Sequence, residues 1–194
     1  MSTICVYCGS SPGNDPAFLR AAREVGSLMA QRGHSLVYGG GNSGLMGVAA
    51  DAVLAAGGQV VGVIPDNFVR QELAHKGLTK LHVVSTMHER KALMASLADG
   101  FLALPGGIGT LEEIAEVFVW TQLGLHTKPC ALLNTNGYYD PLVSFLTRMT
   151  DARFLRTEQL AQLIVAREPA EALDRLLSFT PTVVEKWMDR KQAG

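Results

Sequence analysis

Short apolar runs alternate with helix-length segments along almost the whole chain, and this alternation constrains the fold more than any other feature. Strand-like runs lie at residues 4–8, 35–38, 60–64, 81–84, 101–104, 129–133 and 163–165. Helix-like segments lie at residues 16–32, 44–56, 88–98, 110–125, 141–151 and 169–179. Strands that alternate with helices in this way are typical of βα units. The sequence therefore predicts an α/β fold with a mainly parallel sheet.

The domain organisation is simple, because no internal repeat, low-complexity tract or linker interrupts the pattern. A length of 194 residues fits one α/β domain of ordinary size. We predict a single domain at residues 1–180 and a C-terminal tail at residues 181–194. Residues 66–79 have weak periodicity and mixed polarity, and we expect them to fold over a site instead of joining the core.

Charge and hydropathy exclude several classes of partner. Seventeen Lys and Arg residues against eighteen Asp and Glu leave a formal charge of −1. Proteins that bind nucleic acid present a basic surface, so we expect no nucleic-acid partner. No apolar run approaches the roughly 20 residues that span a bilayer, and the N-terminus has no signal-peptide pattern. We therefore expect a cytoplasmic protein that does not engage membranes.

The cysteines and histidines do not have the spacing of metal ligands. Cys5 and Cys8 form a C-x-x-C motif, but Cys5 falls inside an apolar strand and not at the start of a helix. His88 and Glu89 lack the second histidine of a zinc-binding helix. We expect no metal site.

Two glycine-rich loops, at residues 39–44 and 105–109, each follow an apolar strand and precede a helix. Glycines let the backbone approach a ligand closely, and the helix N-terminus offers unpaired N–H groups to an anion. Together the loops predict a phosphorylated ligand. The first loop also matches G-x-G-x-x-G, so a dinucleotide site is an alternative, although no acidic residue follows about 20 positions later at a strand end. Tight turns without a ligand are the other alternative.

The second loop leads to Thr110 and Glu113, which have two interpretations. Thr110 could be the N-cap and Glu113 its partner in a capping box, with no role in catalysis. Alternatively, a carboxylate in the first turn of a phosphate-binding helix would lie near the ligand's sugar, where it can stabilise a developing oxocarbenium ion. The side chain of Glu112 would point about 100° away around the helix.

Arg90 lies at helical spacing from the apolar residues Met87, Met94 and Leu97. Its side chain could extend along this apolar face to solvent. The alternative is a guanidinium that points inward, where its fixed fork of donors suits recognition of phosphate or of a polarised base.

The motifs resemble the LOG ("lonely guy") family, the cytokinin riboside 5′-monophosphate phosphoribohydrolases. Pro-Gly-Gly-x-Gly-Thr-x-x-Glu at residues 105–113 and Met-x-x-Arg-Lys at residues 87–91 carry most of the resemblance. Further matches run from Cys-Gly-Ser-Ser at residue 8, through Tyr-Gly-Gly-Gly at 38, Gly-Leu-Met-Gly at 44 and Trp-Thr-Gln-Leu-Gly at 120, to Asn-Gly-Tyr-Tyr at 136. The resemblance therefore covers nearly the whole chain.

The resemblance implies a Rossmann-like fold with helices on both faces of the sheet, usually assembled as a homodimer. It also implies hydrolysis of AMP, or of an N6-modified AMP, to the free base and ribose 5-phosphate. Arg90 and Glu113 match the catalytic pair. The predicted substrate-binding residues are Ser10, Gly40, Gly41, Gly44, Glu72, Lys91, Gly107, Ile108, Gly109 and Thr110.

We expect this reaction to need neither a metal nor a redox cofactor. Members of the family have also been labelled "lysine decarboxylase", but the sequence shows no Schiff-base lysine with an acidic partner for a pyridoxal ring. A non-catalytic nucleotide or molybdenum-cofactor carrier is the alternative function, because related Rossmann-like proteins share the glycine loops. Plant members tend to carry Thr where this chain has Val119, so contacts there are not transferred.

The expected helix at residues 110–125 has apolar side chains nearly all the way round. Such a helix is buried on more than one side. Together with the resemblance, this pattern predicts a symmetric dimer through the helix.

Overall fold

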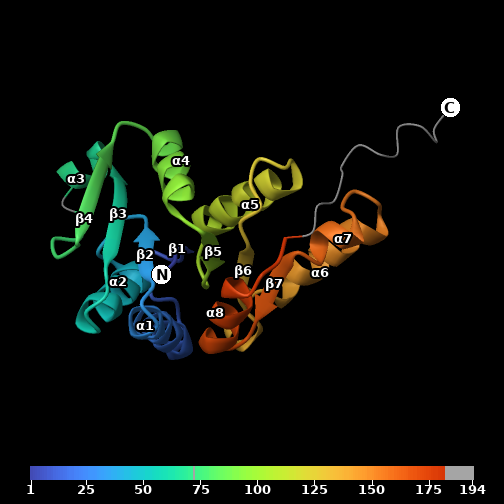
Figure 1. The fold of residues 1–194 in the computed structure, drawn as a ribbon, viewed down its shortest axis with the longest axis horizontal. Helices are drawn as coiled ribbons and strands as arrows, with labels where there is room; N and C mark the ends of the chain where they lie inside the picture. The colour runs from blue at the N-terminus through green and yellow to red at the C-terminus, as the bar shows by residue number, and fades with distance from the viewer. Residues whose placement is uncertain (72, 182–194) are drawn as a thin grey trace.

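The computed structural model describes residues 1–71 and 73–181, and its strands form one seven-stranded sheet (Figure 1). All strand pairs are parallel, and the order across the sheet is β4-β3-β2-β1-β5-β6-β7. The strands are β1 (Thr3–Tyr7), β2 (Ser35–Tyr38), β3 (Val60–Pro65), β4 (Lys80–Val84), β5 (Gly100–Ala103), β6 (Cys130–Leu133) and β7 (Leu163–Ala166). The predicted parallel sheet is confirmed.

Helices connect successive strands. They are α1 (Pro16–Gln31), α2 (Gly44–Ala55), α3 (Asp66–Arg70), α4 (Met87–Leu97), α5 (Ile108–Gln122), α6 (Asp140–Asp151), α7 (Thr157–Leu160) and α8 (Pro169–Leu177), with a 3-10 turn η1 (Thr135–Gly137). Asp15 caps α1 by accepting a hydrogen bond from the Ala17 N–H at 2.8 Å, and Pro16 takes the first helical position. None of the helices in the described part of the chain is long and apolar enough to cross a membrane.

The sheet is buried between two helical layers, because alternate residues of each strand point to opposite faces. Ile4 and Val6 of β1 face the layer formed by α1, α2 and α8. Cys5 and Tyr7 face the other layer, to which α4 and α5 contribute their buried residues. This arrangement confirms the expected helices on both faces.

The chain reverses its direction of travel across the sheet at β1. From β1 it moves outward to β4, then returns to β5 on the other side of β1 and continues to β7. In open parallel sheets, ligands bind outside the carboxyl ends of strands at such a switch point. The two glycine-rich loops follow β2 and β5, the two neighbours of β1.

Most predicted boundaries are close to the observed ones, and every predicted strand end lies within one residue of the observed end. Two short helices, α3 and α7, were not predicted. Helix α5 begins at Ile108, two residues earlier than expected. The predicted tail lies outside the described residues, apart from Pro181.

Within the single chain, helix α5 is buried on one side, and its expected second buried side stays the predicted dimer interface. Ile114, Val117 and Phe118 are buried against the sheet. The opposite side exposes an apolar stripe at four-residue intervals, made of Leu111, Ala115, Val119 and Leu123. Within one chain, α5 therefore has one buried side and one exposed apolar side.

Candidate functional site

A cavity of about 370 Å³ lies at the switch point of the sheet. Its backbone-rich wall comes from the loops that follow β1, β2 and β5. The residues of this wall are Cys8, Gly9, Ser10, Gly39, Gly41, Ser43, Gly107, Gly109 and Thr110. Its volume is in the usual range for small-molecule sites. The cavity contains Ser10, Gly41, Gly107, Gly109 and Thr110 from the predicted binding residues.

The N-terminus of α5 opens into this cavity. Leu111 makes the first intrahelical hydrogen bond of α5, donating its N–H to the Gly107 carbonyl at 3.1 Å. The N–H groups of the preceding residues therefore have no acceptor within the helix. Gly107, the N-cap, provides no side-chain cap. This end of α5 can accept an anionic group from a ligand.

The loop before α5 is fixed by close backbone packing. A Cβ at Gly106 would overlap the Thr110 hydroxyl and would lie 2.9 Å from the Gly9 nitrogen. The phenol of Tyr138 donates to the Gly106 carbonyl at 2.5 Å, and the phenol of Tyr139 donates to the Leu104 carbonyl at 2.6 Å. The loop is therefore held from both the α5 side and the start of α6.

Arg90 and Glu113 form an ion pair at the cavity wall. The Arg90 Nη1 lies 3.2 Å from the Glu113 Oε1, and the two side chains are 14% and 12% exposed. The Arg90 Nε also donates to the Val63 carbonyl at 3.1 Å. A Cβ at Gly39 would overlap the Arg90 Nη2, so the glycine makes room for the guanidinium. Arg90 therefore points inward, and the structure brings these two predicted catalytic residues together.

The surroundings of Glu113 change its acidity. Burial raises the pKa of the Glu113 carboxyl above its ordinary value of 4.5, while the Arg90 charge opposes this effect. A glutamate with a raised pKa in a cavity is a common feature of catalytic sites, although ion-pair networks also produce such shifts.

The capping-box interpretation of Thr110 and Glu113 is wrong. Helix α5 begins at Ile108, so Thr110 already lies within the helix and cannot be its N-cap. Thr110 is buried against Gly106, and Glu113 pairs with Arg90 instead of returning to the helix start. The carboxylate is therefore available to the cavity and does not serve helix capping.

Lys91 does not line the cavity. Its ammonium, on a side chain that is 10% exposed, contacts the carboxylate of Glu112 and lies 3.2 Å from that of Glu116. The hydrogen bond to Glu112 is the main cause of the raised pKa of Lys91, so the side chain stays charged. The structure therefore places this predicted substrate contact in an ion-pair bridge between α4 and α5.

Three other predicted residues lie near the cavity without lining it. Gly40 adopts a φ of 74°, and its carbonyl accepts the His75 N–H at 2.9 Å. Gly44 has a φ of 60° and packs so closely on Ser10 that a Cβ there would overlap its backbone. The side chain of Ile108 is 81% exposed. Glu72, the remaining predicted contact, lies outside the described residues.

The apolar wall of the cavity was missed by sequence reasoning. It consists of Met46, Ile64, Phe68, Leu73 and Met87. Phe68 and Leu73 belong to the irregular segment at residues 66–79, which was expected to fold over a site. Backbone contacts hold the segment there, since the Asn42 N–H donates to the Leu73 carbonyl at 3.0 Å and Gly41 bridges to Ala74.

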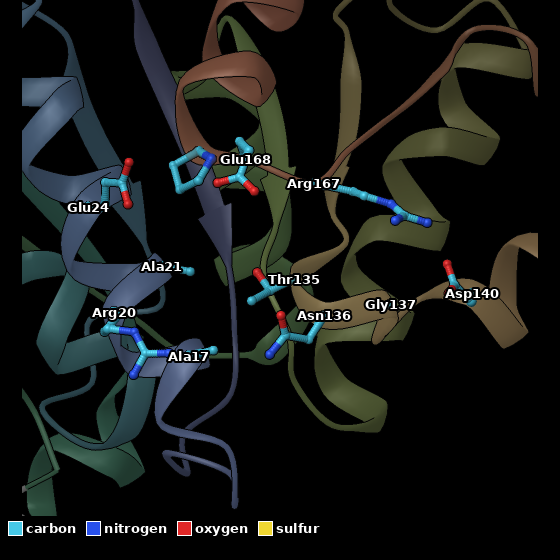
Figure 2. A pocket seen from close by; sticks show the side chains of 11 residues that line it. Ala17, Arg20, Ala21, Glu24, Thr135, Asn136, Gly137, Asp140, Arg167 and Glu168 are labelled. Carbon is cyan, nitrogen blue, oxygen red and sulfur yellow. The ribbon is translucent and has the colours of Figure 1, made fainter.

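A second and larger cavity, of about 460 Å³, lies at the carboxyl ends of β6 and β7 (Figure 2). Its lining comes from α1, η1, the start of α6 and the turn before α8. The lining residues are Ala17, Arg20, Ala21, Glu24, Thr135, Asn136, Gly137, Asp140, Arg167, Glu168 and Pro169. None of the predicted site residues is among them. The smaller cavity combines the glycine loops with the Arg90–Glu113 ion pair, so it is the candidate functional site in spite of its size.

Comparison with known proteins indicates the same family as the motifs. A family model described as "Possible lysine decarboxylase" matches residues 46–176. A cytokinin riboside 5′-monophosphate phosphoribohydrolase of Rhodococcoides fascians is 47% identical over 177 residues, which cover 91% of this chain and 89% of that protein. The chain belongs to the LOG family. Another member, the enzyme of that name from Oryza sativa subsp. japonica, is 45% identical over 92% of this chain and 74% of its own length.

Solved structures extend the LOG fold to more distant proteins. The molybdenum cofactor carrier protein from Chlamydomonas reinhardtii has a TM-score of 0.69 and 23% identity, over 92% of this chain and 99% of that chain. The molybdenum cofactor binding protein from Rippkaea orientalis has a TM-score of 0.69 and 24% identity, over 91% and 96% of the two chains. These likenesses show the fold alone, and they confirm the Rossmann-like expectation.

Proposed function

We propose that the chain hydrolyses the N-glycosidic bond of a purine nucleoside 5′-monophosphate, releasing the base and ribose 5-phosphate. The observation that carries this proposal is the buried Arg90–Glu113 pair, which lines the same cavity as the open N-terminus of α5. The names of the curated LOG-family relatives support the reaction class.

The geometry suggests a role for each part of the cavity. The phosphate binds at Gly107, Gly109 and Thr110, where the helix N-terminus supplies N–H donors and partial positive charge. Glu113 then faces the ribose, where its negative charge stabilises the oxocarbenium-like transition state and orients the attacking water. The water adds its oxygen to C1′ of the ribose, and the departing base takes up the bonding electrons and a proton.

Arg90 supports the departure of the base. Its guanidinium stays charged and is anchored by the Val63 carbonyl and by Glu113. In this position it orients the substrate and stabilises electron density on the leaving group. Lys91 and Glu72 stay predicted substrate contacts from the family resemblance, and neither is needed for these steps.

The apolar wall accommodates the base. Met46, Phe68, Leu73 and Met87 offer thioether, aromatic and aliphatic surface in the same cavity as the glycine loops. This surface fits a purine ring, either adenine or adenine with an apolar N6 substituent. Turnover of AMP and of isopentenyladenosine monophosphate, measured side by side, decides which base is preferred.

A nucleotide or cofactor carrier is the second candidate, because the fold is shared with molybdenum-cofactor carrier proteins. The buried Arg90–Glu113 pair favours the enzyme, since a carrier has no need for a carboxylate beside the sugar. Incubation with AMP and chromatography for free adenine distinguishes the two: release of adenine supports the enzyme, and tight binding without release supports the carrier.

We also propose that the chain works as a homodimer in the cytoplasm, without nucleic acid. The exposed stripe of α5 supports the dimer, because a contiguous apolar surface rimmed by polar residues is typical of a protein interface. The nearly balanced formal charge of −1 supports the absence of a nucleic-acid partner.

A further inference from the structure

The Arg90–Glu113 pair joins helices that rest on different parts of the sheet. Helix α4 packs on β1 to β4, whereas α5 packs on β1, β5 and β6. The two side chains therefore meet across the switch point, and their separation depends on how α4 and α5 are placed relative to each other.

The neighbouring residue on α4 makes a second connection across the same gap. Lys91 is 9% exposed, although lysine is rarely buried without a partner. Its ammonium lies between the carboxylates of Glu112 and Glu116 on α5. These two glutamates are one helical turn apart, where like charges repel each other, and the cation between them removes that repulsion.

The bridge lies directly beside the proposed catalytic carboxylate. Glu113 follows Glu112 in α5 and pairs with Arg90, which precedes Lys91 in α4. Two consecutive residues of α4 are thus paired with acidic residues of the first three turns of α5. A shift of either helix would disturb both connections together.

We propose that Lys91 is a positioning residue, whose buried ammonium holds Glu112 and Glu116 and thereby keeps α5 placed so that Glu113 meets Arg90 at the cavity. This inference rests on the proposed function. A positioning role for Lys91 and a role as a direct substrate contact predict different kinetics. A positioning residue supports the rate of the bound substrate, whereas a substrate contact supports binding.

The charges around Glu113 give the bridge a second effect. The Glu112 and Glu116 charges raise the pKa of Glu113, and the Arg90 and Lys91 charges lower it. Without Lys91, two uncompensated carboxylates would remain beside Glu113, and its pKa would rise further. From β1 and the residue that follows it, the groups that face Glu113 are Cys5, Tyr7 and Cys8. Burial raises the pKa of all three and keeps them protonated.

The test compares Lys91→Met with the full-length wild-type protein. We expect kcat for AMP to fall by about tenfold or more, because small displacements of catalytic groups cost rate, while KM changes less than about twofold. The acid limb of the pH–rate profile should move to higher pH. The triple variant K91M/E112Q/E116Q should move the limb back, because it removes the repelling charges together with the cation.

A matched control is Arg32→Met, which removes another ion pair between elements. The Arg32 Nη1 lies 2.7 Å from the Asp174 Oδ1, and both residues belong to the helical layer on the other face of the sheet from α4 and α5. Loss of this ion pair should leave kcat and KM unchanged. Should Lys91→Met fail to fold, Glu112→Gln and Glu116→Gln each break one half of the bridge. Each should lower kcat without raising KM.

A titration of the Glu113 carboxyl by ¹³C NMR, assigned by its loss in Glu113→Gln, keeps the two proposals separate. If the wild type releases no adenine, the proposed function fails, but the titration still reports on Lys91. An increase of KM at unchanged kcat would identify Lys91 as a substrate contact and overturn the proposal. Unchanged kcat, KM and titration in Lys91→Met would overturn it as well.

Discussion

Arg90 reaches Glu113 across the switch point of the sheet, at 3.2 Å, through a space that Gly39 leaves open. The relationship explains why these residues line one cavity although they lie on helices of different βα units. Because Glu113 pairs with Arg90 and does not cap α5, its chemical role can be tested without removing a helix cap.

Replacing Glu113 by Gln should reduce turnover of AMP by about 10²-fold or more, equivalent to about 2.7 kcal/mol of transition-state stabilisation. Because Glu113 does not cap α5, a fall in melting temperature should reflect only the lost charge pairing with Arg90. Turnover and thermal unfolding of the variant check this. Glu171→Gln is the control, since Glu171 is an exposed residue of α8; Glu112 is unsuitable because it contacts Lys91. Near-normal turnover in Glu113→Gln would refute the catalytic assignment.

The pH dependence should reflect the raised pKa of Glu113. The carboxylate must be ionised to stabilise positive charge, so kcat/KM falls as the pH falls through this pKa. Since burial raises the pKa above 4.5, the fall should begin at higher pH than for an exposed glutamate. The Arg90 charge lowers the pKa, so Arg90→Met should move the acid limb further upward. Rate profiles from pH 4 to 8 check both shifts, and a wild-type limb at or below 4.5 would contradict them.

Gly106, in the loop before α5, and Gly109, in the first turn of α5, should respond differently to substitution by alanine. Gly109 lines the cavity, and a Cβ there would meet no protein atom within 4 Å, so the added methyl group would take up space beside the bound phosphate. Gly109→Ala should therefore leave stability unchanged or slightly higher, while KM for AMP rises by about tenfold, or 1.4 kcal/mol. At Gly106, a Cβ would overlap Thr110, so Gly106→Ala should unfold at a lower temperature. Equal KM values for the wild type and Gly109→Ala would argue against phosphate binding at α5.

Loss of the phenol hydroxyl should cost different amounts of unfolding free energy at Tyr138 and Tyr139, because the two side chains differ in burial. Tyr139 is 5% exposed, and Tyr139→Phe leaves the Leu104 carbonyl without this donor, at a cost of about 1–3 kcal/mol in unfolding free energy. Tyr138 is 42% exposed, so water can replace its hydrogen bond to Gly106, and Tyr138→Phe should cost less than about 1 kcal/mol. Urea unfolding of both variants measures the difference, and the reverse order would contradict this account.

The exposed stripe of α5 should control the oligomeric state. Leu123→Asp places a charge on this stripe, where dimer formation would bury it without a partner. We expect light scattering at micromolar protein to give the monomer mass for this variant and the dimer mass for the wild type. Phe154→Asp is the control, because Phe154 is 89% exposed and lies beyond α6. A monomeric wild type would exclude the dimer.

The strands could be predicted closely because buried parallel strands are nearly continuous apolar runs. The start of α5 could not be predicted closely, because Ile108 and Gly109 are weak helix formers. The helix nevertheless begins at Ile108, where Thr110 packs on Gly106. The motifs located Arg90 and Glu113, but the sequence does not tell which way the adjacent Lys91 points. The apolar wall depends on the contact of residues 73–75 with the first glycine loop, and such long-range pairings have no local sequence pattern.

The close contact between Gly39 and Arg90 ties two positions that lie 51 residues apart. A side chain at position 39 would occupy the present place of the guanidinium, so Arg90 would have to move away from its position beside Glu113. Among divergent relatives, the two positions should therefore change together. A relative with a residue other than glycine at position 39 should either lack the arginine or hold its guanidinium elsewhere, and in both cases it should lack the pairing described for this cavity. The residue types at positions 39 and 90 could thus distinguish hydrolases from non-catalytic binding proteins among chains that share this fold.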